Sequence, residues 1–248
     1  MKKLSLQVYA VLLIGLVSFS SCLKDDDNGD YNNMPSAGLM FFVNSYPDSE
    51  ALLYRLDGNI VANPLSGAPM KLDYQMFSGA QWLYPGKRYL TVTGYNANEQ
   101  VLIDTAINIK TGQGYSSFIY GDKEKPLFAM TEDNPIDKKA GESGIRFLNL
   151  ANGIGPVNLY IEGQEEPLYT ERPIETGAST VEHEDFQPQK DGVYTFIVTD
   201  AEGNELARRE YKNEDNGNGL LSSYYTIMLV GNANDEINPL YIGVVDHR

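Results

Sequence analysis

Two histidines, His183 and His247, are the side chains of this chain best suited to acid–base chemistry or to binding a transition metal. A zinc site needs three or four His, Cys or carboxylate ligands at set spacings, and the segment Glu182-His183-Glu184-Asp185 offers one His among acids. On a strand, Glu182 and Glu184 would share one face while His183 and Asp185 point to the other. We therefore expect an exposed polar strand or loop there, and a frayed chain end at His247.

Other catalytic signatures are weaker still. The sequence contains neither a Gly-x-Ser-x-Gly elbow nor a phosphate-cradling Gly-Lys-Ser/Thr loop. Residues 200–205 and 232–236 gather oxygen ligands, but neither has the spacing of an EF-hand calcium loop, and we predict a hairpin turn with Gly203 at positive φ for the first. We predict no catalytic residue, no metal and no cofactor, and rank a hydrolase last among the functions.

Aromatic side chains offer a third kind of chemistry. The chain has 17 Tyr and one Trp, and the densest group is Gln81-Trp82-Leu83-Tyr84-Pro85-Gly86. Trp82 and Tyr84 are two apart and so fall on the same face of a strand. Such a pair is a candidate ligand-binding platform for a sugar ring or a protein partner. The alternative is that both rings belong to the core.

The single cysteine, Cys22, follows a pattern typical of export. Lys2 and Lys3 precede an almost wholly apolar run at residues 4–19, and small residues come just before Cys22. This is a signal peptide, and the run is shorter than the roughly 20 residues of a spanning helix. We predict lipidation of Cys22, because an unpaired thiol is a liability in an exported protein and two or more acyl chains give a stable membrane anchor.

This stretch resembles a bacterial lipobox, with Phe19 where Leu is commonest, a looseness seen in lipoproteins of the Bacteroidota. The residues after it resemble the lysine-plus-acids export signal that sends such lipoproteins to the outer face of the outer membrane: Lys24, Asp25, Asp26 and Asp27. The alternative is a solvated acidic linker. Asp104-Thr105-Ala106 resembles the O-glycosylation pattern of exported Bacteroidota proteins, which makes Thr105 a candidate modification site.

The net charge of the chain limits the classes of molecule that it is expected to bind. The chain carries a formal charge of −15 at pH 7. That balance argues against nucleic acid and against docking on anionic lipid headgroups, and it suits a solvated extracellular surface. The membrane partner is therefore expected to be reached through the lipid on Cys22.

The folded part is predicted to be all β. Short runs rich in aromatic and β-branched residues, separated by turn signals, indicate sandwich strands. They lie at 39–43, 51–56, 70–77, 89–95, 101–109 and 115–120.

The pattern then repeats 106 residues later, as Gly38 and Gly144 show, and the spacing widens to 110 residues between Gly121 and its match Gly231. We predict two tandem immunoglobulin-like or transthyretin-like β-sandwiches. The expected organisation is a signal peptide at 1–21, a lipidated flexible tether at 22–36, a first sandwich at 37–130, a linker at 131–143 and a second sandwich at 144–248.

The repeat unit resembles the domain of unknown function 4397 family. The stretch Asn44-Ser45-Tyr46-Pro47-Asp48 and the turn Asp57-Gly58 match its opening, and Pro85-Gly86 and Gly112-Gln113-Gly114-Tyr115 match its later steps. The second copy matches less well, with Ala151-Asn152-Gly153 in place of the first stretch. The resemblance implies a β-sandwich of unsettled function, with no catalytic residue to carry over.

Taken together, these features favour a non-enzymatic lipoprotein of the outer membrane, facing the cell exterior and presenting two sandwiches for binding or adhesion to a glycan or protein ligand. The alternative is a structural lipoprotein of fimbria-like type, assembled by adding a donated strand to an open sheet edge.

Replacing the cysteine tests the anchor. We expect Cys22→Ala to give a folded protein that is no longer membrane-bound, because the acyl chains have lost their attachment atom. Fractionation into membrane and soluble material, with circular dichroism of the released chain, measures both properties. Continued tight membrane association of the variant would contradict the lipidation of Cys22.

Overall fold

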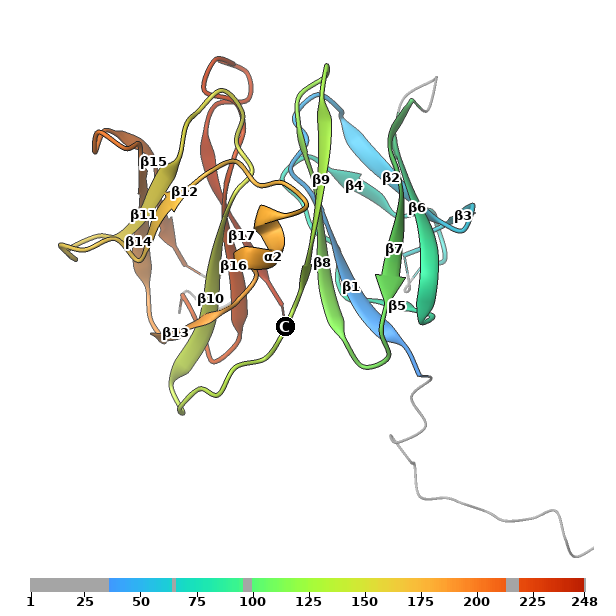
Figure 1. The fold of residues 1–248 in the computed structure, drawn as a ribbon, viewed down its shortest axis with the longest axis horizontal. Helices are drawn as coiled ribbons and strands as arrows, with labels where there is room; N and C mark the ends of the chain where they lie inside the picture. Colours follow the sequence, from blue (N-terminus) through green and yellow to red (C-terminus); the bar gives the residue numbers. More distant parts are fainter. Residues whose placement is uncertain (1–35, 64–65, 96–99, 213–218, 248) are drawn as a thin grey trace, which may run out of the picture. The chain divides into compact units, whose positions relative to one another are not determined.

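Strands account for almost all the regular structure in the computed structural model, which describes residues 36–63, 66–95, 100–212 and 219–247 (Figure 1). The all-β prediction is confirmed, since the described residues form seventeen strands and one short helix. None of the helical segments in these ranges has the length and apolarity to cross a membrane. Ser36–Arg248 is a single compact unit. Cys22 and the export signal at 24–27 lie outside the described residues.

Nine strands form the first half of this unit: β1 (Gly38–Asn44), β2 (Ala51–Leu56), β3 (Asn59–Ile60), β4 (Lys71–Asp73), β5 (Gln81–Leu83), β6 (Gly86–Gly94), β7 (Val101–Ile109), β8 (Gly114–Gly121) and β9 (Pro126–Glu132). One sheet has the order β5-β1-β8-β9, with β1 parallel to β8. The other has the order β3-β2-β6-β7, and β4 also pairs with β2.

The second half contains eight strands and the helix: β10 (Glu142–Asn149), β11 (Val157–Ile161), β12 (Tyr169–Arg172), α2 (Ser179–Glu182), β13 (Gln187–Lys190), β14 (Tyr194–Thr199), β15 (Glu205–Tyr211), β16 (Tyr224–Val230) and β17 (Tyr241–Asp246). Its sheets have the orders β13-β10-β16-β17 and β12-β11-β14-β15. The parallel pair β10–β16 corresponds to β1–β8, so both halves share one strand order.

Each half has its own core between its two sheets. In the first, Leu90 and Val92 of β6 are fully buried against Phe42 of β1 and the other members of one hydrophobic cluster. In the second, Phe196 and Val198 of β14 occupy the corresponding place in another cluster. Each such side chain stabilises the fold by about 1.5–3 kcal/mol relative to exposure. The alternation that identifies these strands in the sequence is therefore the alternation between core and solvent.

Two glycines matched by the repeat have the same structural role. Gly121 and Gly231 have φ of +94° and +96°, in the region that side chains with a Cβ rarely adopt. A Cβ at either position would also collide with the backbone oxygen of Lys125 or Pro239, respectively. Both sandwiches thus end their parallel central strand, β8 or β16, with a turn that requires glycine.

A third hydrophobic cluster joins the two sandwiches, and we call it the sandwich interface. It combines side chains from the outer faces of β8 and β9 with side chains from β10, β16 and β17, so the central strands are buried on both faces. Its fully or almost fully buried members are Val43, Phe118, Tyr120, Ala129, Leu148, Leu150, Met228, Val230 and Val245. The sequence prediction of two sandwiches did not include this packing of one against the other.

One side of the sandwich interface is polar. Arg146 of β10 is fully buried, and its guanidinium donates to the Asp133 carboxylate at 2.7 Å and to the Thr226 hydroxyl at 2.8 Å. The Thr226 hydroxyl lies 2.8 Å from Nε2 of His247. His247 is therefore buried and not frayed, contrary to the prediction, and its ring packs edge-on against Phe41 at 5.0 Å. Burial lowers its pKa from 6.5 to about 4.

The prediction of an exposed polar strand or loop at residues 182–185 is correct only in part, since Glu182 and Asp185 are exposed and residues 183–185 form a loop, but His183 is half-buried. Ser179–Glu182 form α2, and Nδ1 of His183 lies 2.9 Å from the carboxylate of Glu175. The Glu175 side chain is fully buried, and burial raises its pKa from 4.5 to about 7. The backbone oxygen of Glu175 accepts a hydrogen bond of 2.5 Å from Tyr120 of the first sandwich. This acid–histidine pair therefore lies at the contact between the two sandwiches.

Glu175 makes stability depend on pH. Because its pKa is raised from 4.5 to about 7, its contribution is fully present below pH 4.5 and is lost as the pH rises through about 7. We expect Glu175→Gln, which stays neutral, to gain about 2–3 kcal/mol of unfolding free energy relative to wild type over that window. Urea unfolding of both proteins from pH 4 to 8 measures the difference. A difference that does not change with pH would contradict the prediction.

His247 should act in the opposite direction. Its pKa is lowered from 6.5 to about 4, so its contribution is present above pH 6.5 and is lost as the pH falls through about 4. We expect His247→Gln to reduce the acid-induced loss of unfolding free energy by about 2–3 kcal/mol relative to wild type. The same urea series extended to pH 3.5 tests this. Parallel curves for variant and wild type on the acid side would rule it out.

Candidate functional site

The aromatic pair singled out in the sequence is exposed. Trp82 is 53% exposed and Tyr84 is 74% exposed, whereas Gln81 and Leu83 between and beside them are buried. The two rings therefore project from the same face of the edge strand β5 and the residue after it, as the spacing predicts. The alternative that both rings belong to the core is wrong.

These rings border a cavity of about 400 Å³, which we call the aromatic groove. Its remaining walls come from the turn between β2 and β3, the residues after β3, and the start of β6: Leu56, Asp57, Asn59, Ile60, Val61, Ala62, Gln81, Leu83 and Arg88. The volume lies in the range of small-ligand sites, which combine apolar and aromatic walls with a few fixed polar groups. Ile60, itself 42% exposed, adds apolar surface beside the rings.

The polar groups of the aromatic groove are held in place by one another. Arg88 pairs with the Asp57 carboxylate at 3.0 Å and donates to the backbone oxygen of Tyr84 at 2.9 Å. The guanidinium lies 5.9 Å from the centre of the Tyr84 ring. The other Asp57 oxygen accepts the backbone N–H of Tyr89, which with Arg88 lowers the Asp57 pKa below its usual value. A ligand would therefore meet groups that need little reordering on binding.

A ring nitrogen of each histidine is engaged by a neighbouring side chain, Glu175 for His183 and Thr226 for His247. The Ser179 hydroxyl donates to Glu175 at 2.7 Å and not to His183, so no nucleophile is paired with a histidine base there. Nε2 of His247 is taken by the Thr226 hydroxyl inside the sandwich interface. Among the described residues, no group of three or more His, Cys, Asp or Glu side chains could hold a metal ion.

The two oxygen-rich loops are bonded within themselves. Asp200 accepts the backbone and side-chain N–H groups of Asn204, both at 2.8 Å, and Gly203 has φ of +87°. The hairpin turn predicted for this segment is confirmed. In the second loop, Asp235 accepts the backbone N–H of Ile237 at 2.8 Å. These carboxylates stabilise their own turns.

Thr105 lies on β7, an edge strand, and is half-buried opposite the buried Leu90. It shares the core-facing side of β7 with Ile103 and Ile107, while the Asp104 side chain faces the other way and accepts the Thr91 hydroxyl at 3.0 Å. The hydroxyl of Thr105 thus lies on the less accessible side of the strand.

Comparison with solved structures found two proteins that resemble this chain only remotely. The tip fimbrial protein Mfa3 from Porphyromonas gingivalis, with a C-terminal truncation, matches at 10% identity and a TM-score of 0.24, over 85% of this chain and 99% of that one. A candidate cell adhesion protein from Bacteroides uniformis ATCC 8492 matches at 10% identity and a TM-score of 0.24, over 86% of this chain and 100% of that one. With TM-scores this low, we draw no inference about this chain from either.

Comparison with curated proteins found no match. Comparison with family models found one that bears on the sequence prediction. Residues 38–160 match the model of a family described as "Domain of unknown function (DUF4397)", a range that includes all strands of the first sandwich and continues into β11. The resemblance of the first sandwich to this family, predicted from its sequence motifs, is thus confirmed over residues 38–160.

Proposed function

We propose that this chain is a non-enzymatic binding or adhesion protein, anchored through a lipid on Cys22 at the outer membrane and facing the cell exterior. The observation that supports binding is the aromatic groove, where Trp82 and Tyr84 are exposed beside the fixed Arg88–Asp57 pair. Exposed rings of this size, gathered at one place, are costly to leave in water and are typical of interaction sites.

A glycan fits the aromatic groove better than an apolar partner does. Flat rings offer an apolar surface on which a sugar ring can lie, and the charged pair and the Asn59 amide offer hydrogen-bond donors and acceptors to its hydroxyl groups. The sandwich interface supports the same role in another way, because it fixes the two modules with respect to one another and limits the ordering that binding would require.

Removing the rings tests the proposal. We expect Trp82→Ala and Tyr84→Ala each to weaken glycan binding by about tenfold or more, since exposed aromatic anchors carry much of the energy of such contacts. Both variants should keep the melting temperature of wild type, because neither ring is part of the core. A glycan array selects the ligand, and isothermal titration with residues 36–248, the compact unit, gives the affinities.

The matched control is Tyr95→Ala, which removes another ring, 47% exposed, that does not line the aromatic groove. It should leave the affinity unchanged. Wild-type affinity in both groove variants, or an equal loss in the control, would refute the aromatic groove as the site. Self-association of wild type through its sheet edges, in place of ligand binding, would instead support the fimbria-like assembly role.

A further inference from the structure

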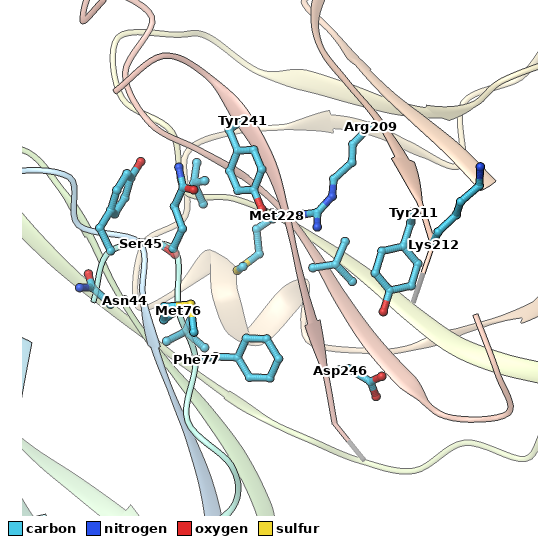
Figure 2. A pocket seen from close by; sticks show the side chains of 16 residues that line it. Asn44, Ser45, Met76, Phe77, Arg209, Tyr211, Lys212, Met228, Tyr241 and Asp246 are labelled. Carbon is cyan, nitrogen blue, oxygen red and sulfur yellow. Dashed lines mark hydrogen bonds between the residues drawn. The ribbon is translucent and has the colours of Figure 1, made fainter. Parts of the chain in front are cut away.

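A second cavity, of about 460 Å³, lies where the two sandwiches meet (Figure 2). Its first wall comes from the end of β1 with the residue after it, and from residues 74–77; its second wall comes from β15, β16 and β17. We call it the interface groove. It shares no lining residue with the aromatic groove, so it is an independent site.

Arg209 of β15 is the distinctive charge of the interface groove. One terminal nitrogen of its guanidinium donates to the Tyr241 hydroxyl at 2.6 Å and to the backbone oxygen of Ile242 at 2.7 Å. Figure 2 shows this guanidinium pointing into the groove beside Tyr241. Its contacts with the described residues include no carboxylate, whereas its neighbour Arg208 pairs with both Glu162 and Glu205. A half-buried cation is thus held by neutral groups.

The donors that remain on Arg209 form a fork. A guanidinium has five N–H donors, and the two on one terminal nitrogen match the two recorded hydrogen bonds. Nε and the other terminal nitrogen have no hydrogen-bond partner among the described residues, and together they present two parallel N–H groups. This is the arrangement that binds both oxygens of a carboxylate at once.

The rest of the interface groove is suited to an apolar body. Met228 and Val230 of β16 face Phe77 and Met76 across it, and Met76 is 55% exposed. Methionine side chains are flexible and polarizable, so they adapt to the shape of an apolar ligand. Ser45, which is 2% exposed, also lines the groove, and so does Tyr74, whose buried hydroxyl has no hydrogen-bond partner among the described residues.

We propose that the interface groove binds a small-molecule monocarboxylate with an apolar body, whose two oxygens pair with Nε and the free terminal nitrogen of Arg209. The carboxylate supplies the missing counter-charge, and the apolar body lies against Met76, Phe77 and Met228. Lys212 and Asp246 also line the groove and carry opposite formal charges, so the charge of Arg209 is the one that a single carboxylate would balance.

The test uses 3-phenylpropionate as the probe and 3-phenylpropionamide, its uncharged analogue, as the comparison. Titration into ¹⁵N-labelled residues 36–248, followed by amide NMR shifts, should show saturable binding of the acid with shifts around the groove, and binding of the amide at least about tenfold weaker. Equal binding of acid and amide, or no saturable binding of the acid up to about 10 mM, would overturn the proposal.

Variants locate the site. Arg209→Gln should weaken binding of the acid by about tenfold or more, while Arg208→Gln, the same change one residue away at an exposed ion pair, should leave it unchanged. Because Arg209 also bonds to β17, its loss could unfold the groove. Met76→Trp fills the groove from an exposed position without touching Arg209, and it should abolish binding at an unchanged melting temperature. Full binding in Met76→Trp, or an equal loss in Arg208→Gln, would contradict this assignment.

Discussion

The burial of both faces of the central strands is the constraint on which the rest of this structure depends. β1, β8, β10 and β16 each place one row of side chains in the core of their own sandwich and the other row against the opposite sandwich. On a sheet with one solvated face, every second residue can be polar. In these four strands both rows of side chains are buried, so a polar residue is tolerated only where it has a hydrogen-bonding partner. The interface groove exists because this packing leaves a gap at one end, and the aromatic groove lies on an edge strand that the packing leaves free.

The polar side of the sandwich interface shows how such an exception is maintained. Arg146 would be strongly destabilising there without Asp133, since a buried charge needs a paired and hydrogen-bonded partner. Asp133 follows β9 and Arg146 lies in β10, so this pair ties the end of the first sandwich to the start of the second. Glu175 and His247 titrate in opposite senses within the same interface, so the changes in their contributions to stability offset one another between pH 4.5 and 6.5.

The sequence predicts strands and turns well here and predicts long-range contacts poorly. The alternation around Trp82 and Tyr84 and the positive φ of Gly203 are local, so spacing alone finds them. The continuous apolar run at 39–43 indicates a strand that is buried on both faces, but a single sequence does not identify the part of the chain that covers the second face. The burial of His183 and His247 depends on Glu175, Arg146 and Asp133, and α2 is too short for a helical period to appear. Arg209 differs from Arg208 only through the strand face on which each lies.

The parallel pairing of β1 with β8 has a mechanical consequence. β1 is the first strand of the compact unit, and its register with β8 runs without interruption from Leu39 opposite Gly114 to Asn44 opposite Ile119. A pull directed along β1 toward its start would load these hydrogen bonds together, in shear, and would not break them one at a time as peeling from an end does. The hydrophobic packing of both faces of β1 would resist the same pull in addition to the hydrogen bonds. A pull applied to the chain ahead of β1 would therefore be resisted by the whole β1–β8 pairing at once.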